Sequence, residues 1–272
     1  MKKLTIFFLA VCLPVILFGK SRVNATDIMN DIENGKNIKY NDVEIVGELN
    51  FSFLSDYDED KNWGNREVTF WHHVRVEIEF TDCIFRDGVI AYFNDEDEDI
   101  VHNAIFHKDV TFSNCQFKGL SEFKYVRFER MADFDQAQFD EEANFKYTKF
   151  EDEVSFNATR YEREANFKYS QFNTKISFAN SEFGEEGNFK YTKFEDSVDF
   201  NNAIFTEEAN FKYTKFPEGV NFSEATFREL ANFKYTKFSD PTNFDNVKFQ
   251  RNADFKHTTL NGRKFKKYHI DD

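Results

Sequence analysis

The chain has 272 residues, of which 37 are Phe, whereas Gly and Pro account for only 10 and 3. Globular enzymes usually spread their apolar residues over Leu, Ile, Val and Ala and mark their turns with Gly and Pro, so this composition argues against an ordinary sandwich, barrel or α/β enzyme. The aromatic residues argue against disorder. The formal net charge of −14 argues against a protein that binds nucleic acid over its whole surface.

The N-terminal residues predict a secretory signal. A basic start precedes a largely apolar run at 4–18, and small residues follow it. We assign residues 1–21 to a signal peptide, cleaved after Ser21 or after Ala25, and expect an exported protein that is periplasmic, cell-surface or extracellular. A retained anchor is a weaker interpretation, because a membrane span needs about 20 apolar residues. Lipidation at Cys12 is a further alternative.

Residues 22–66 are assigned to an N-terminal cap and an acidic loop. A short helix is predicted over 26–35, with Thr26 at its N-cap, Ile28 on its apolar stripe and Gly35 at its end. Such a helix would cover the end of a repeat domain, which otherwise exposes unpaired strand edges.

The acidic stretch 56–65 is predicted to be a loop. Asp56, Asp58 and Asp60 alternate as in a calcium-binding loop, but Lys61 stands where such a loop requires Gly. We therefore expect no calcium site in this stretch.

Aromatic residues repeat with a fixed period through most of the chain. Between Phe106 and Phe255, 28 positions are spaced alternately 6 and 5 residues apart, and all are Phe except Tyr161. The period is therefore 11, and Asn-Phe-Lys-Tyr returns every 22 residues. The residue two positions before each aromatic is nearly always small or β-branched, as at Ala143 and Val154.

Inward positions i−2 and i, with polar residues between and after them, form the pattern of a strand. An 11-residue period also fits a right-handed coiled coil. However, the repeat is rich in poor helix formers, and its Phe residues would form two separate stripes on a helix. We predict instead an all-β solenoid in which each coil has four short strands and four inward aromatic rings. Like residues of successive coils would stack about 4.8 Å apart, the spacing of neighbouring strands.

The repeated units resemble those of the pentapeptide-repeat family, which consist of a small residue, a polar residue, Leu or Phe, and two variable residues. Ala-Asn-Phe-Lys-Tyr at 143–147 and Thr-Lys-Phe-Glu-Asp at 148–152 fit this unit, and alternate units carry one extra residue, such as Glu153. The resemblance covers about residues 67–260 and implies a right-handed, four-sided parallel β-helix. Some cytoplasmic members of the family are acidic mimics of duplex DNA that bind DNA gyrase, and most have no assigned activity. Residues 261–272 are assigned to a basic C-terminal tail.

Residues with catalytic or metal-binding potential are few. Cys83 and Cys115 fall at interior positions of the repeat, so we expect two buried thiols rather than a disulfide bond. The histidines make no recognised metal-binding spacing, although His102 and His107 lie near an acidic run. The sequence contains no phosphate loop and no nucleophile–histidine–acid motif. We expect no enzyme activity, no metal and no cofactor, and keep the irregular segment 72–107 as the alternative location for either activity or metal.

The most unusual predicted surface feature is a basic and aromatic strip. A column of Lys recurs every 22 residues with a column of Tyr beside it, and a mostly basic column follows one strand later. Lysines about 4.8 Å apart repel each other by roughly 0.9 kcal/mol even in bulk water, which favours a platform for an anionic partner, with the Tyr rings as flat apolar area. The opposing interpretation is that Lys stems cover the core and that duplication of one unit produced the columns. The candidate strip comprises Lys124, Lys146, Lys168, Lys190, Lys212, Lys234, Tyr125, Tyr147, Tyr169, Tyr191, Tyr213, Tyr235, Lys149, Lys193, Lys215 and Lys237.

The sequence thus predicts an exported, non-enzymatic solenoid that serves as a structural scaffold or as a protein- or glycan-binding surface. Its partner would be an unknown protein or an anionic polymer, nucleic acid is not expected, and membrane contact is limited to the signal segment. The alternative is an acidic DNA mimic that inhibits a nucleic-acid enzyme such as gyrase. The signal segment and the lysine columns argue against this alternative.

Overall fold

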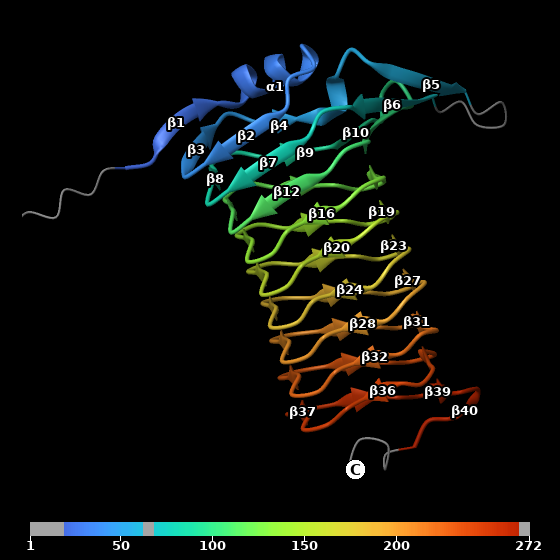
Figure 1. The fold of residues 1–272 in the computed structure, drawn as a ribbon. Helices are drawn as coiled ribbons and strands as arrows, with labels where there is room; N and C mark the ends of the chain where they lie inside the picture. The colour runs from blue at the N-terminus through green and yellow to red at the C-terminus, as the bar shows by residue number, and fades with distance from the viewer. Residues whose placement is uncertain (1–18, 62–67, 267–272) are drawn as a thin grey trace, which may run out of the picture.

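The computed structural model describes residues 19–61 and 68–266, so the signal peptide predicted for 1–21 lies almost entirely outside the described residues. The chain winds into coils that stack as a single column, with the N-terminal residues at one end and the C-terminal residues at the other (Figure 1). Strands of successive coils pair in parallel and form four sheets. The predicted four-sided parallel β-helix is confirmed.

Four parallel ladders form the walls of the column, and most of their strands are only two residues long. Sheet A contains β1 (Ser21–Asn24), β3 (Val43–Val46), β8 (Ile84–Phe85), β13 (Gln116–Phe117), β17 (Gln138–Phe139), β21 (Arg160–Tyr161), β25 (Glu182–Phe183), β29 (Ile204–Phe205), β33 (Thr226–Phe227) and β37 (Lys248–Phe249). Sheet B contains β2 (Ile38–Asn41), β7 (Ile78–Thr81), β12 (Val110–Ser113), β16 (Ala132–Asp133), β20 (Val154–Ser155), β24 (Ile176–Ser177), β28 (Val198–Asp199), β32 (Val220–Asn221) and β36 (Thr242–Asn243).

The other two walls are also parallel ladders of short strands, except at the two ends of sheet D, where antiparallel strands are added. Sheet C contains β4 (Leu49–Asn50), β9 (Val89–Ile90), β14 (Ser121–Glu122), β18 (Ala143–Asn144), β22 (Ala165–Asn166), β26 (Gly187–Asn188), β30 (Ala209–Asn210), β34 (Ala231–Asn232) and β38 (Ala253–Asp254). Sheet D contains β5 (Tyr57–Lys61), β6 (Val68–Val74), β10 (Tyr92–Asp95), β11 (Ile100–Phe106), β15 (Arg127–Phe128), β19 (Lys149–Phe150), β23 (Gln171–Phe172), β27 (Lys193–Phe194), β31 (Lys215–Phe216), β35 (Lys237–Phe238), β39 (Thr259–Leu260) and β40 (Arg263–Lys264).

The alternating spacing of the aromatic residues corresponds to two kinds of corner. One coil passes from sheet A through C and D to B, as in β17, β18, β19 and β20. Five-residue spacings produce the tight corners between C and D and between B and A, where the Thr148 N–H donates to the Phe145 carbonyl over 3.1 Å. Six-residue spacings produce the wider corners, which hold the extra residues such as Glu153.

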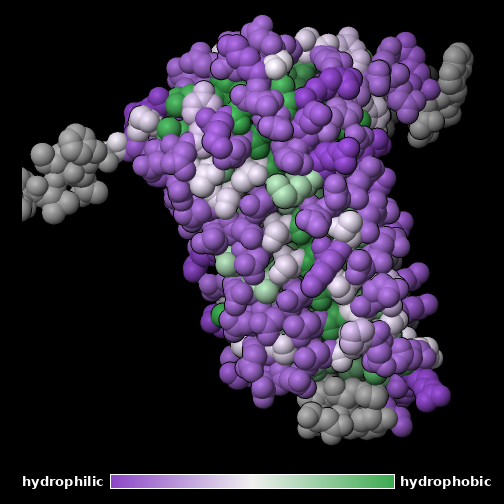
Figure 2. Space-filling view, viewed as in Figure 1, coloured by the Kyte–Doolittle hydropathy of each residue, from purple (hydrophilic) through white to green (hydrophobic). Residues whose placement is uncertain are grey.

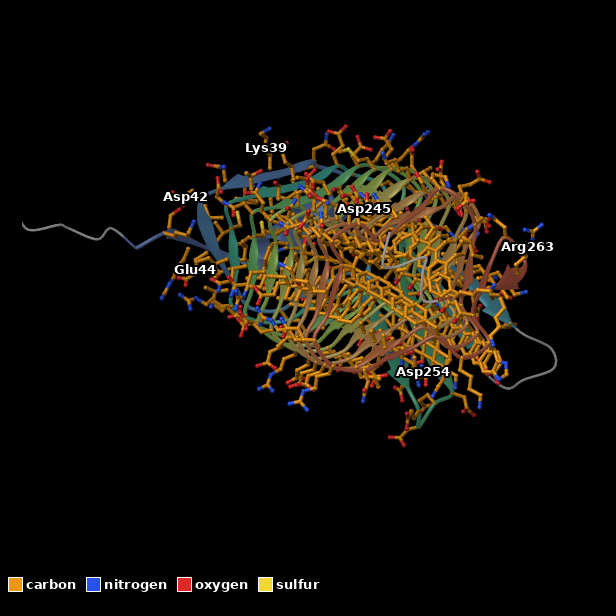
Figure 3. All side chains as sticks on the ribbon, turned by 90° about the horizontal axis from the view of Figure 1, so that it is seen from below. Lys39, Asp42, Glu44, Asp245, Asp254 and Arg263 are labelled. Carbon is orange, nitrogen blue, oxygen red and sulfur yellow. The ribbon has the colours of Figure 1, made fainter. Side chains whose placement is uncertain are left out.

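The aromatic rings fill the interior of the column in files. Phe145 lies 5.1 Å from Phe167 of the next coil, centroid to centroid and 2° from parallel, and it meets Phe156 edge to face at 5.2 Å. Seen along the column, side chains such as Lys39 of sheet B and Asp254 of sheet C point outward on opposite sides (Figure 3). Burying one Phe contributes about 1.5–3 kcal/mol before the entropy loss is counted, so these files are the main driving force for folding.

Small residues two positions before each ring complete the core. Ala143 and Ala165 are fully buried beneath the walls. Where the residue is Thr or Ser, its hydroxyl donates to a carbonyl of the preceding coil, as Thr192 does to the Phe167 oxygen over 2.7 Å. A buried hydroxyl is tolerated here because it has an acceptor.

The N-terminal end of the column is covered by α1 (Ala25–Glu33), whose buried residues include Ile28. The predicted helix is confirmed, but Asn24 rather than Thr26 occupies its N-cap, and Asn24 makes no side-chain capping bond. The helix ends before Gly35, which adopts a positive φ of 70°. Among the described residues, no helix has the length and apolar character needed to cross a bilayer.

Parallel pairing begins earlier in the chain than the regular aromatic repeat does. Strands β1 to β4 already occupy sheets A, B and C, and the single-turn 3₁₀ helix η1 (Phe51–Phe53) follows them. The loop predicted for 56–65 is wrong over its first half, because β5 runs antiparallel to β6. Its acidic residues have poor strand propensity, and the pairing with β6 overrides that propensity.

The C-terminal end is closed by a short hairpin. Strand β40 pairs antiparallel with β39, and Phe265 then turns back onto the last rings of the core, 4.7 Å from Phe255. The basic tail predicted for 261–272 therefore begins as a closing strand, and its residues 267–272 lie outside the described part of the chain. On the face shown in Figure 2, hydrophilic side chains cover most of the column.

Candidate functional site

The Lys and Tyr columns of the candidate strip form the tight corner between sheets C and D. Each Lys, such as Lys146, is the first central residue of a two-residue turn, and Tyr147 is the second. The turn is supported by Asn144, whose side-chain oxygen accepts the Lys146 N–H over 3.1 Å. Because each coil from β14 onward repeats this turn, the corner becomes a continuous ridge, which we call the Lys–Tyr ridge.

Every Tyr of the ridge adopts a left-handed backbone conformation that usually favours Gly or Asn. The φ angles of Tyr147, Tyr169 and Tyr213 are 62°, 64° and 65°. Such a backbone costs of order 1–3 kcal/mol and persists only where the surrounding structure compensates for it. The compensation here is ring stacking, since Tyr147 and Tyr169 lie 4.8 Å apart and 4° from parallel.

The stacking corrects one expectation about the Tyr column. Because each ring lies face to face with the next, as Tyr191 does with Tyr213 at 4.7 Å, the faces are not available as flat apolar area for a partner. The exposed parts are the ring edges and the hydroxyl groups. The column is therefore a row of phenol donors and acceptors, repeated once per coil.

The lysines of the ridge lie against these rings. The ammonium groups of Lys146, Lys168, Lys190 and Lys212 are 5.2–5.4 Å from the centroids of the adjacent Tyr rings, within cation–π range. Over 19–61 and 68–266, none of these four has an ion pair within 4.0 Å. Burial, together with the like charges of Lys168 and Lys124, lowers the pKa of Lys146. Within the described residues, no ion pair offsets the repulsion in this part of the column, although the charge of Glu164 partly opposes it at Lys146.

The two ends of the column differ from its middle. At the first coil, the Lys124 ammonium donates to the Tyr92 hydroxyl over 3.0 Å and lies 4.4 Å above the Tyr92 ring. At the other end, Lys234 forms an ion pair with Asp254 at 3.0 Å. Tyr125 and Tyr235, the first and last rings of the column, are 38% and 40% exposed.

A shallow groove of about 460 Å³ separates the Tyr column from the second basic column on sheet D. It is lined by Tyr169, Tyr191 and Tyr213 on one side and by Lys193, Lys215 and the carboxylate-bearing Glu195 on the other. Lys193, Lys215 and Lys237 are exposed, whereas Lys149 forms an ion pair with Glu151 at 2.6 Å. The structure therefore brings the predicted strip together as one surface, with hydroxyl groups between two rows of ammonium groups.

Comparison with known proteins identifies the family. A family model described as pentapeptide repeats (9 copies) matches residues 102–149, 189–236 and 222–263. The chain belongs to the pentapeptide-repeat family. No curated protein and no solved structure matches the chain. Between the matched segments, residues 150–188 of this pentapeptide-repeat protein continue the same sheets without interruption.

The wide corner between sheets A and C of the pentapeptide-repeat column is acidic. Glu142, Glu164, Glu186 and Glu208 follow one another there, one coil apart. Burial and the neighbouring carboxylate of Glu186 raise the pKa of Glu164. Sheet C thus separates an acidic corner from the Lys–Tyr ridge.

The irregular segment 72–107 contains two histidine pairs that the sequence did not reveal. His72 Nε2 lies 2.9 Å from His102 Nδ1, and His73 Nδ1 lies 2.8 Å from His107 Nε2. The second pair continues to the Glu129 carboxylate, 2.7 Å from His107 Nδ1. Among the described residues, no three His, Cys, Asp or Glu side chains come together as a metal-binding group. The pairs depend on the register between β6 and β11, which no local sequence pattern encodes.

The two cysteines are buried free thiols in adjacent coils of sheet A, as predicted. The Cys115 thiol donates to the Phe80 carbonyl over 3.4 Å, and the Cys83 thiol to the Thr81 carbonyl over 3.3 Å. Their positions are those of the small residue before each ring, so both fill the core.

Proposed function

We propose that this pentapeptide-repeat protein is an exported, non-enzymatic scaffold that binds an anionic partner, a protein or a glycan, along its Lys–Tyr ridge. The observation that carries the proposal is the row Lys146, Lys168, Lys190 and Lys212, which forms no ion pair within the described residues although the net charge of the chain is −14. A folded chain with so many carboxylates has ample opportunity to pair these lysines internally. Two neighbouring lysines about 4.8 Å apart repel each other by about 0.9 kcal/mol even in bulk water. A partner that carries one negative charge per coil would offset this repulsion.

The groove beside the ridge supports the same proposal. Tyr191 and Tyr213 offer hydroxyl groups and Lys193 offers an ammonium group across a cleft of about 460 Å³. Phenol and ammonium groups donate hydrogen bonds to carboxylate, sulfate or phosphate oxygens. A linear polyanion that lies along the column would meet the same donors at every coil, about 4.8 Å apart.

The test measures retention of the mature chain on immobilised alginate and on poly-glutamate. We expect the triple substitution Lys146→Gln, Lys168→Gln and Lys190→Gln to abolish retention on at least one of them. The matched control replaces Lys108, Lys175 and Lys248 by Gln, which changes the net charge equally away from the ridge. Equal losses in both triple variants, or no binding by the native chain, would refute the ridge as the site.

The alternative function, an acidic mimic of duplex DNA, has one observation in its favour, the acidic corner between sheets A and C. The lysines of the ridge lie on the other side of sheet C from this corner. Their positive charges interrupt the acidic surface that a DNA mimic needs. Inhibition of gyrase supercoiling by the purified mature chain would favour the alternative over binding along the ridge.

A further inference from the structure

Sheet D widens at its N-terminal end into a flange that projects beyond the coils. Strands β6 and β11 are seven residues long instead of two, and β5 and β10 flank them in the order β5-β6-β11-β10. Their last residues, including Val74 and Phe106, are buried in the core, whereas their first halves extend past it. Figure 1 shows β5 and β6 reaching outward beside the end covered by α1.

One face of the flange carries a continuous aromatic patch, which consists of Phe53, Tyr57, Phe70, Phe93 and His102. The register places Tyr57 opposite His72 and Phe93 opposite His102, so these side chains share one face. Phe53 of η1 lies 4.9 Å from His102 and 5.4 Å from Phe93.

The patch is open to solvent despite its apolar character. The exposed fractions of Phe53, Tyr57 and Phe93 are 54%, 50% and 41%. Side chains of this size usually contribute to folding by burial, and a contiguous exposed apolar patch of this kind marks an interaction site. The flange therefore presents a binding surface distinct from the Lys–Tyr ridge.

The hydrogen bonds of His72 and His102 determine which ring nitrogen of the patch can accept a hydrogen bond from a ligand. His72 Nδ1 lies 2.7 Å from the Leu54 carbonyl, which can only accept, so His72 donates through Nδ1. Burial lowers the pKa of both His72 and His102, so the neutral form of both rings prevails at neutral pH. His72 Nε2 then accepts from the Nδ1–H of His102, and His102 Nε2 retains a lone pair that needs a donor.

Carboxylates border the patch on two sides. Glu59 stands opposite Phe70 on β5, and Asp95 follows Phe93 by two residues on β10, so both lie on the face of the patch. Glu59 is paired with Lys61 at 3.0 Å, whereas Asp95 accepts backbone N–H groups of the turn that follows it. The turn that continues from β10 is acidic at each of residues 95–99. Its side chains form no ion pair in the described part of the chain.

We propose that the aromatic patch of the flange binds an arginine-bearing peptide segment of another protein. Three independent features favour this ligand. The aromatic faces attract a planar guanidinium group, the carboxylate of Asp95 with the acidic turn behind it matches the charge of that group, and the lone pair of His102 accepts one of its N–H groups. A quaternary ammonium group would leave this lone pair without a donor, and an apolar partner would bury the Asp95 carboxylate, which has no ion-pair partner among the described residues.

The experiment measures the binding of a fluorescein-labelled peptide of alternating Ala and Arg to the mature chain by fluorescence anisotropy. We expect Phe53→Ser combined with Phe93→Ser, which leaves the net charge unchanged, to weaken binding about fivefold or more. The same peptide with citrulline in place of Arg should not bind. Thermal unfolding of the double variant checks that the column remains folded.

A second comparison separates the patch from the general acidity of the chain. Glu59→Gln with Asp95→Asn should weaken binding, whereas Glu141→Gln with Glu207→Gln, an equal change of charge at the acidic corner, should leave it within about twofold. Equal effects of the two pairs would overturn the proposal, as would unaltered binding by the Phe variants. Competition by spermidine as effective as that by unlabelled peptide would also overturn it, because it would identify a small polyamine as the ligand.

Discussion

The ring of Tyr161 lies 5.2 Å from that of Phe139, centroid to centroid and 4° from parallel, and thus continues a file of phenylalanines. Its hydroxyl is fully buried and has no hydrogen-bond partner within the described residues, and burial raises the pKa of Tyr161 well above its ordinary value. A buried unpaired hydroxyl costs about 1–3 kcal/mol. We therefore expect Tyr161→Phe to raise the free energy of unfolding by about 1–2 kcal/mol, as measured by urea denaturation.

The control for this substitution is the next ring of the same file. Phe183 stacks on Tyr161 at 5.1 Å and is fully buried. Phe183→Tyr introduces a second buried hydroxyl and should lower stability by a similar amount. A destabilised Tyr161→Phe variant would mean that the hydroxyl has a partner, such as an ordered water molecule.

The Tyr column allows strain and stacking to be measured separately at Tyr169, whose φ is 64°. Both Tyr169→Ala and Tyr169→Gly remove the stacking with Tyr147 and Tyr191, 4.8 and 4.9 Å away. Only the Ala variant keeps the strained backbone, so we expect it to be less stable than the Gly variant by about 1 kcal/mol. Equal stability of the two, measured by thermal and urea unfolding, would show that the corner imposes no strain.

Gly219 occupies a position at which no side chain fits. Its φ is 88°, and a Cβ there would lie 2.1 Å from the Pro241 carbonyl oxygen of the next coil. Gly219→Ala must displace the backbone of that coil, and we expect a loss of roughly 2–4 kcal/mol in the free energy of unfolding. Gly262, with a φ of 72° and open space around it, is the control, and Gly262→Ala should lose about 1 kcal/mol. If both variants lose the same amount, the contact with Pro241 is not the cause.

The four-sided column was predictable because the same spacing of aromatic residues is repeated in every regular coil. Each inward ring, such as Phe145 or Phe167, is required both by its spacing and by burial. The extra residue of alternate units lies at the wider corners, which the sequence pattern alone did not distinguish from the tight ones. The left-handed backbone of Tyr147 was not predictable, because no Gly or Asn marks the turn and ring stacking compensates for the strain. The strand β5 and the pair His72–His102 also escaped prediction. Both depend on pairing between segments outside the regular repeat, where sequence periodicity carries no information about register.

The acidic corner between sheets A and C makes the stability of the column depend on pH. Burial and the charge of Glu186 raise the pKa of both Glu164 and Glu208 above the ordinary value of 4.5. Between this value and the raised one, the folded chain binds more protons than the unfolded chain, so the contribution of these groups to stability falls as the pH rises. The contribution of Glu164 and Glu208 to the free energy of unfolding is therefore most favourable below pH 4.5 and least favourable at neutral pH.

The double substitution Glu164→Gln and Glu208→Gln removes this effect. We expect the variant to have a higher melting temperature than the native chain at pH 7, with a difference that shrinks as the pH is lowered toward 4.5. The native chain and the variant must be compared at the same pH, because some other carboxyl groups act in the opposite direction. One is Asp254, whose pKa is lowered by the hydrogen bond from the Lys256 N–H and by Lys234. Glu207→Gln, at an exposed residue of the same corner, serves as the control. A difference that grows toward acidic pH would show that the two carboxylates stabilise the column in their charged form.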